Sequence, residues 1–394
     1  MSVGSAGCAG VGAQAATMAM NFQPLSQHKN RFEVGKPTPY SIFDVSGRLL
    51  LARGHHFEST EQLEKLIDRE ATVDVRELDD PSKRISHARR DQLPAFWDAS
   101  MGEMGRLLRA DPNIDFTNSL DHAARPLAAL IERDPDLAIL QAVRAEALTG
   151  GPTSYSARHA VHTATAACLA ATRLGWTVEQ RQCVLRVSLT MNIAMADLQN
   201  KLVTQVSPVT TLQRAEIQSH PERSANMLEM AGVTDKDWLD AVRQHHEEDG
   251  GTGYPNHVAK VNEVAQLVHS ADTFTAKLSP RQQRQPLLAD AAARMQYQCH
   301  KGDVMTAALI KEFGLYPPGC AVKLKSGEFG MVMKRGENAS TPIVAVFTDR
   351  TGMSRLEPLR RDTALPEFGI TAVIPMSALK VRVGLDKLIQ AVPD

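Results

Sequence analysis

The sequence has 394 residues, of which 43% are hydrophobic and 23% are charged, a composition typical of a globular protein with two or three domains. The 44 Lys and Arg residues almost balance the 45 Asp and Glu residues, so the sequence predicts no broad basic surface for duplex nucleic acid. Its apolar runs are too short to span a membrane, and its five scattered cysteines lack a C-x-x-C spacing. We therefore expect a cytoplasmic protein that binds no membrane.

Three segments precede the main helical region. Residues 1–36 begin with a stretch rich in Ala, Gly and Ser, which predicts a disordered tail. A small β/α module is expected over residues 37–75, where apolar runs on both sides of Ser46-Gly47 predict a hairpin. Residues 76–115 are expected to form a polar linker followed by a helix.

The periodicity of the chain is helical over residues 116–315, where apolar residues recur at three- and four-residue spacing between Gly and Pro breaks. After Tyr316-Pro-Pro-Gly319, short β-branched runs alternate with turn sequences, which predicts a small β subdomain over residues 316–394. The sequence thus predicts a mainly α fold. We expect a helical bundle with a small N-terminal β-containing module and a small C-terminal β subdomain.

The most informative segment runs from His245 to Pro255 and reads His-His-Glu-Glu-Asp-Gly-Gly-Thr-Gly-Tyr-Pro. Two adjacent histidines beside carboxylates concentrate metal-ligating groups at the end of a helix. The glycines and the proline that follow require a tight turn, because Gly adopts positive φ freely and Pro cannot continue a helix. The alternative interpretation is a solvated polar helix end.

Other candidate ligands lie on helical segments elsewhere in the chain. His159 lies near the start of one predicted helix, His220 precedes Pro221 in another, and Asp272 interrupts an apolar helix where an unpaired carboxylate is costly. Each histidine taken singly is more often an ordinary surface or core residue. Together with His245 and His246 they form a set of N and O donors suited to divalent Fe, Mn or Zn.

These residues and their spacing resemble the HD-GYP domain, a bacterial metal-dependent phosphodiesterase for cyclic di-GMP. The resemblance covers roughly residues 120–315 and implies an HD-domain-like helical bundle. It also implies metal ligands at His159, His220, His245, His246 and Asp272, and substrate contacts from Gly253, Tyr254 and Pro255. The flanking β segments are similar to modules that precede and follow this domain in some members.

The sequence departs from the family pattern where an adjacent His-Asp pair is expected. The apolar pattern of residues 184–196 places Met191 and Asn192 at that pair, and Met195 where the family has a Lys. Asn cannot bridge two cations as Asp does, and the Met thioether is a poor ligand for Fe(II) or Mn(II). No catalytic residue is therefore assigned, and Met191, Asn192 and Met195 are read as degenerate positions. A second departure is Gly250, which stands where the family has Asp.

Two basic residues follow Asp272 at positions where family members carry phosphate-contacting side chains. Arg281 and Arg284 are candidates for substrate binding, and the alternative is that both are simply solvated. The sequence between them differs from the family.

The resemblance and the departures together predict fewer metal ions than an intact member holds. His220, His245 and His246 are expected to hold one divalent ion, and His159 and Asp272 are the remaining ligands of a neighbouring, impaired site. Our first hypothesis is an inactive protein that binds cyclic di-GMP or docks on a partner such as a GGDEF-domain protein. The alternatives are an active phosphodiesterase that forms pGpG or GMP with a reduced metal set, and a purely structural ion.

Overall fold

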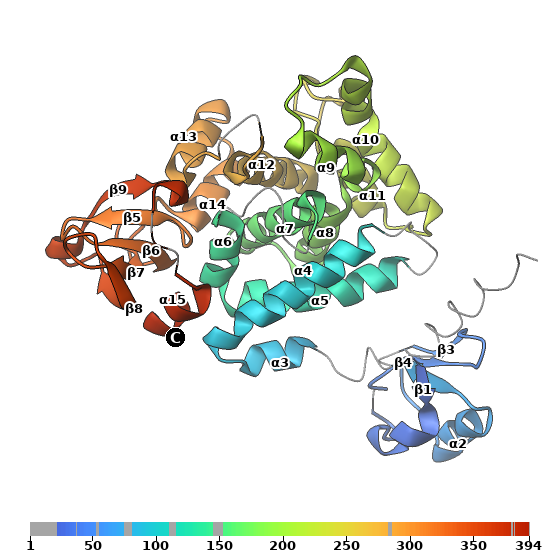
Figure 1. Cartoon of the computed structure of the whole chain (residues 1–394). Coiled ribbons are helices and arrows are strands. Elements are labelled where there is room, and N and C mark those ends of the chain that lie inside the picture. Colours follow the sequence, from blue (N-terminus) through green and yellow to red (C-terminus); the bar gives the residue numbers. More distant parts are fainter. Residues whose placement is uncertain are drawn as a thin grey trace, which may run out of the picture. The chain divides into compact units, whose positions relative to one another are not determined.

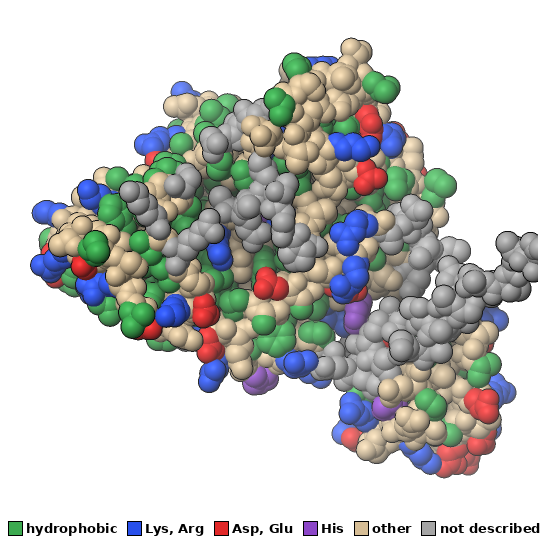
Figure 2. Space-filling view, in the orientation of Figure 1, with side chains coloured by type: hydrophobic (Ala, Val, Ile, Leu, Met, Phe, Trp, Pro, Cys, Tyr) green, Lys and Arg blue, Asp and Glu red, His purple; other side chains and the backbone are tan. Residues whose placement is uncertain are grey.

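A computed structural model describes most of the chain (Figure 1), namely residues 22–36, 38–52, 55–74, 81–109, 116–144, 153–282, 286–379, 381 and 383–393. The chain divides into two compact units, residues 1–84 and residues 85–394. In the described part of the chain no helix combines the length and the hydropathy that a bilayer crossing needs. On the face shown in Figure 2, basic and acidic side chains are interspersed, in keeping with their near-equal totals.

The N-terminal unit is a small sheet with one helix against it. The strand order is β1-β4-β2-β3, and the elements are β1 (Phe22–Pro24), η1 (Leu25–Arg31), β2 (Ile42–Phe43), β3 (Leu49–Leu51), α2 (Thr60–Asp68) and β4 (Thr72–Asp74). The predicted hairpin at Ser46-Gly47 is present as the antiparallel pair β2–β3, and Gly47 has the positive φ that the turn requires.

One prediction for this unit is wrong. Residues 22–36 were expected in the disordered tail, but β1 pairs antiparallel with β4 and Leu25 is fully buried in the core of the unit. The pairing joins Phe22 to Asp74, and a partner so distant in sequence leaves no local signal. Residues 1–21 of the predicted tail lie outside the described residues.

The second unit is built mainly of helices, as predicted. They are α3 (Pro81–His87), η3 (Arg90–Gln92), α4 (Leu93–Leu107), α5 (Phe116–Arg133), α6 (Pro135–Val143), α7 (Tyr155–Arg173), α8 (Val178–Thr190), η4 (Ile193–Met195), α9 (Ala196–Thr204), α10 (Thr211–Met230), α11 (Lys236–Gln244), α12 (Glu263–Leu278), α13 (Ala289–Cys299) and α14 (Val304–Phe313). The expected linker contains α3, because Ile85 is fully buried and anchors that segment.

Helix α7 lies at the centre of this unit, packed against α8, α12 and α14 (Figure 1). Its sequence is rich in alanine, and these small side chains are almost all buried, which lets neighbouring helices approach closely. Its start is fixed by Ser154, whose hydroxyl accepts a hydrogen bond from the Ala157 backbone N–H. This packing sets the position of His159, one turn into the helix.

The C-terminal sheet is antiparallel with the strand order β8-β7-β6-β5-β9. Its elements are β5 (Ala321–Leu324), β6 (Phe329–Lys334), β7 (Ile343–Thr348), β8 (Ser354–Asp362), η5 (Pro366–Phe368), β9 (Ile370–Ile374), η6 (Met376–Ala378) and α15 (Leu385–Ala391). The predicted β subdomain is thus present. Its buried side chains belong to the same hydrophobic core as the helices, so the sheet has no separate core.

Buried ion pairs fasten the sheet to the helices. Arg90 is 3% exposed and donates to Asp134 at 2.7 Å, to the Val392 carbonyl at 2.6 Å and to the Met333 carbonyl at 3.0 Å. Asp134 in turn accepts from the Leu137 N–H at the start of α6. Because the buried Arg90 guanidinium has an acidic partner and two carbonyl acceptors, it does not carry the free-energy cost of an unpaired buried charge. Its contacts instead fix how the C-terminal sheet packs against the helices.

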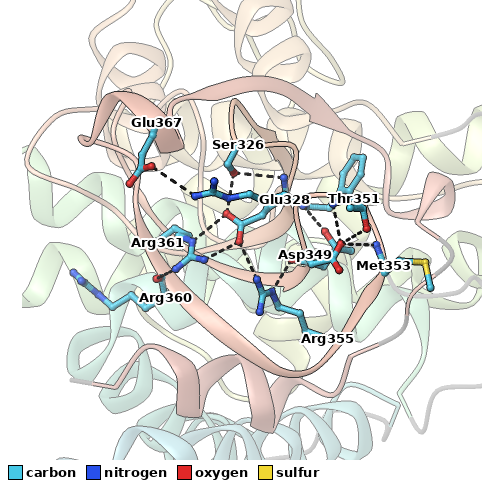
Figure 3. Close-up of polar contacts among 12 residues, drawn as sticks. Ser326, Glu328, Asp349, Thr351, Met353, Arg355, Arg360, Arg361 and Glu367 are labelled. Atoms are coloured by element: carbon cyan, nitrogen blue, oxygen red, sulfur yellow. Dashed lines mark hydrogen bonds and ion pairs between the residues drawn. The ribbon is translucent and has the colours of Figure 1, made fainter.

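A second satisfied polar cluster lies inside the C-terminal sheet (Figure 3). The Glu328 side chain is fully buried and accepts hydrogen bonds from Arg361 at 2.8 and 3.0 Å and from Ser326 at 2.8 Å, while Arg355 lies 3.5 Å away. Burial opposes ionisation of this carboxyl, but the hydrogen bonds from Arg361 and Ser326 hold its pKa below the ordinary value. We call these four residues the Glu328 cluster.

Candidate functional site

A cavity of about 180 Å³ opens in the helical unit between α7, α9, α10 and α12. Eight of the predicted site residues line it, namely His159, Asn192, Met195, His220, His246, Tyr254, Asp272 and Arg281. His245 is fully buried directly behind His220. Residues that are far apart in the sequence therefore lie around one cavity.

Three histidines form the most compact group of potential ligands. His220 comes from α10, His245 follows α11, and His246 begins the loop after it. One ligand atom from each lies within 4.8 Å of the other two. In the described part of the chain, these histidines form the group of at least three potential ligand residues that could hold a metal ion. We call it the three-histidine cluster.

Backbone carbonyls fix the tautomers of two of these imidazoles. His220 Nδ1 lies 2.6 Å from the Ile217 carbonyl and His245 Nδ1 lies 2.7 Å from the Val242 carbonyl. A carbonyl only accepts, so both Nδ1 atoms carry the proton and donate it. The Nε2 lone pairs are left to face each other at 3.0 Å. Such an arrangement is repulsive unless a proton or a cation lies between the two nitrogens.

The protonation state favours a cation. Burial lowers the pKa of His220 to about 4 and that of His246 to about 3, and it holds the pKa of His245 well below the ordinary value. All three rings are therefore uncharged at neutral pH, which is the form that ligates metals. A spacing of 3.0 Å corresponds to an angle of about 90° at an ion about 2.1 Å from each nitrogen, as in octahedral coordination. The cluster fits one divalent ion.

The loop after these histidines is held by hydrogen bonds to the Glu247 side chain. The Glu247 side chain is 2% exposed and accepts from the Asn256 N–H at 2.5 Å and the Val258 N–H at 3.3 Å. The loop folds back so that the Tyr254 N–H donates to the His246 carbonyl, and the Tyr254 ring stacks on the His246 ring at 4.7 Å. Glu247 thus stabilises the loop, and Tyr254 orients the potential metal ligand His246.

Glycine is needed at residue 253 for a steric reason. A Cβ at Gly253 would lie 2.4 Å from the Glu247 Cα and 2.5 Å from the His246 carbonyl oxygen. Gly253 and Pro255 do not line the cavity, so their predicted contact with substrate stays a prediction. Gly250, which replaces an expected Asp, has φ +89 and open space around its Cα. The adjacent Asp249 instead holds the loop, accepting from the Val261 N–H and from Gln266.

The other half of the cavity is lined by His159, Asn192, Met195 and Asp272, and two of these residues differ from the family pattern. We call it the rewritten half. Met191 is fully buried in the hydrophobic core and does not line the cavity, whereas Asn192 and Met195 do. His159 and Asp272 bind each other instead, with His159 Nε2 2.6 Å from Asp272 Oδ1. Burial would raise the pKa of Asp272, but the hydrogen bond and charge of His159 hold it below the ordinary value.

This half does not fit a second ion of the kind that the family resemblance implies. The two donors that remain are engaged with each other, Asn192 offers no charge, and Met191 points into the core. Two ligands without a bridging carboxylate cannot offset the loss of hydration of a divalent cation. The predicted reduction in metal content stays a prediction.

The basic residues are only partly described. Arg281 lines the cavity and donates to the Tyr155 hydroxyl at 3.4 Å. Arg284, the other predicted phosphate contact, lies outside the described residues.

Sequence reasoning missed two residues of the site. Tyr155 is 8% exposed and stacks on His159, with parallel rings 5.8 Å apart. Gln199 lines the cavity, and its Oε1 is shielded from solvent without a hydrogen-bond partner. Tyr155 lies four residues before His159, on the same helix face, and that spacing could have identified it. Nothing local distinguishes Gln199 from any polar residue of a helix.

Comparisons with known proteins found a family profile, a relative and a solved structure that are similar to this chain. Residues 140–301 match the family profile described as the HD domain. The chain is 26% identical over 271 residues to a cyclic di-GMP phosphodiesterase of Pseudomonas aeruginosa, a match that covers 66% of this chain and 61% of that relative. Among solved structures, an HDG"Y"P protein from Bdellovibrio bacteriovorus matches with a TM-score of 0.43 and 14% identity, over 74% of this chain and 98% of the other.

Proposed function

We propose that this protein binds cyclic di-GMP beside one divalent ion and hydrolyses it slowly or not at all. The proposal is supported by the match of residues 140–301 to the HD domain profile and by the similarity to a cyclic di-GMP phosphodiesterase. One observation carries the proposal. The three-histidine cluster is arranged for an ion, whereas the neighbouring ligands His159 and Asp272 have closed on each other at 2.6 Å.

The nature of the ligand is supported by the relative and by the cavity. The Pseudomonas aeruginosa relative acts on cyclic di-GMP, although this chain spans only 61% of its length. A cavity of about 180 Å³ is large enough for a phosphodiester group, whereas pockets that bind whole drug-sized ligands have volumes of roughly 300–1,000 Å³. We therefore place one phosphodiester inside the cavity and the guanine bases at its mouth.

Impaired hydrolysis follows from the number of ions the residues can hold. In two-metal sites the ions stabilise both the attacking and the leaving oxygen of an in-line displacement, and a single ion supplies only part of that stabilisation. His220 and His246, which line the cavity, would hold the ion, and Tyr254 keeps the His246 ring in place by stacking. Neither Asn192 nor Met195 on the opposite wall offers a general base.

The test measures metal content, binding and turnover on one purified sample. We expect about one Mn(II) or Fe(II) per chain, micromolar or tighter affinity for cyclic di-GMP, and no pGpG or GMP. His246→Ala is expected to lose the ion. Stoichiometric release of pGpG or GMP that disappears in His246→Ala would show instead an active phosphodiesterase with a reduced metal set.

Docking on a protein partner is the remaining alternative. If the folded protein binds no cyclic dinucleotide with or without metal, the nucleotide-binding proposal is refuted. A pull-down with a purified GGDEF-domain protein then tests the docking version directly. Equal melting temperatures with and without a chelator would further show that the ion has no structural role.

A further inference from the structure

We propose that the rewritten half of the cavity binds a phosphodiester directly, with the side-chain amides of Asn192 and Gln199 and the guanidinium of Arg281 as hydrogen-bond donors and with no metal ion. This rests on the proposed function, because cyclic di-GMP supplies the phosphodiester. It gives Asn192 and Gln199 a role opposite to that of a metal ligand: they donate to an anion instead of accepting a cation.

The first step of the argument is the charge of the cavity wall. Besides the histidines and two tyrosines, Asp272 and Arg281 are the ionisable residues that line the described cavity. The Asp272 carboxylate is hydrogen-bonded to His159. An aspartate at residue 192 would add a second carboxylate, whose repulsion of a phosphate only a cation could offset. With Asn192 in its place, formal charges of opposite sign balance and an anion enters without that repulsion.

The second step is the presence of free donors. Asn192 precedes η4 and Gln199 lies in α9, and both side chains line the cavity. Within the described part of the chain neither amide nitrogen donates a hydrogen bond to a protein group. A primary amide carries two N–H donors, so both side chains have donors available for a ligand in the cavity. Phosphate oxygens are the acceptors that such donors can meet.

The third step is a positioned cation. Arg281 donates to the Tyr155 hydroxyl at 3.4 Å, and the Tyr155 ring is itself fixed by parallel stacking on His159. Arg281 forms no ion pair with an acidic residue in the part of the chain that is described. A guanidinium can therefore reach a phosphate at the mouth of the cavity and contact two of its oxygens. The amides on the wall and the arginine at the mouth together surround a tetrahedral anion.

The experiment is a calorimetric titration of the full chain with cyclic di-GMP, once in excess EDTA and once with Mn(II). Inorganic phosphate in EDTA serves as a second probe that lacks bases. We expect the wild-type affinity for cyclic di-GMP in EDTA to stay within about tenfold of that in Mn(II), and phosphate to compete. Binding that requires Mn(II) would overturn this inference and leave the proposed function intact, whereas no binding under either condition would overturn both.

Matched variants assign the donors. In EDTA we expect Asn192→Asp and Asn192→Leu each to weaken binding by about tenfold or more, the usual effect of losing one hydrogen bond to a charged group. The control is Asn200→Asp in α9, since Asn200 lies outside the cavity and uses its oxygen to accept from the Ser156 N–H, as Asp also can. Wild-type affinity in EDTA for folded Asn192→Asp, or equal losses in Asn200→Asp, would overturn the inference.

Discussion

The Glu328 cluster of the sheet and the cavity of the helical region both contain buried polar side chains, yet they differ in whether the buried polar atoms have hydrogen-bond partners. In the Glu328 cluster each carboxylate oxygen meets an arginine, and Ser326 completes the set (Figure 3). In the cavity, His159 Nδ1 and Gln199 Oε1 are buried without a partner. Unsatisfied buried groups are rare in folded proteins, and each calls for an explanation. Ser188, Asp290 and Thr306 carry such atoms outside the cavity, so an unpaired buried atom indicates a binding site only where its residue also lines a cavity.

The largest expected effect lies in the three-histidine cluster. His246→Ala removes one of three nitrogen ligands, and we expect the affinity for Mn(II) to fall by more than about 100-fold, because even residues that only orient metal ligands contribute 10- to 100-fold. His159→Asn provides the comparison within the same cavity, since His159 is engaged by Asp272. Its Mn(II) affinity should stay within about threefold of wild type by isothermal titration. An equal loss in both variants would mean that the two halves share one ion.

A steric change in the loop should have the next largest effect. Gly253→Ala places a Cβ against the backbone of residues 246–248, with no flexible side chain to yield. We expect a loss of about 3 kcal/mol in the free energy of unfolding, at the upper end of overpacking costs. Gly250→Ala is the control, because nothing lies within 4 Å of its Cβ and only the positive φ opposes it. That cost is about 1 kcal/mol, and equal melting temperatures for the two variants would contradict the steric argument.

The protein should lose stability when the carboxylate of the Glu328 cluster is replaced by a weaker acceptor. In Glu328→Gln, Arg361 and Arg355 lose a buried anion, and we expect a loss of about 2 kcal/mol, less than for a fully buried pair because both arginines are partly exposed. Chemical denaturation at neutral pH measures this loss. Because the folded pKa of Glu328 is lowered, the stabilisation is present above the ordinary carboxyl pKa of about 4.3 and is lost as the pH falls through the folded value. A gap between variant and wild type that widens on acidification would refute this assignment.

The sequence was sufficient for the parts of the site that depend on local chemistry. The run from His245 to Pro255 predicted a ligand pair and a tight turn, and the structure places His245 and His246 beside His220. The helical periodicity predicted the bundle that holds them. The substitution at Asn192 was visible because the helix pattern fixed its register, and in the structure its side chain lines the cavity.

What the sequence could not show depends on tertiary packing. Asp272 was expected to be an idle metal ligand, but its contact with His159 depends on how α7 packs against α12. Glu247 was grouped with the metal-ligating carboxylates, yet the folded loop brings two backbone N–H groups to it. The residue type determines which groups a side chain can bind, whereas tertiary packing determines which of those groups lies within reach of it.

The smallest expected effect gives the sharpest contrast with the Glu328 cluster. Gln199→Leu removes a buried oxygen that has no partner in the free protein, so we expect the free energy of unfolding to stay the same or to rise by up to about 1 kcal/mol. Thermal and chemical denaturation measure this change beside Glu328→Gln. A clear loss of stability in Gln199→Leu would show that Gln199 contributes to the stability of the fold. The proposed difference between the Glu328 cluster and the cavity would then be wrong. Gln199→Leu that is as stable as wild type but binds cyclic di-GMP more weakly would show that the unpaired amide is kept for a ligand.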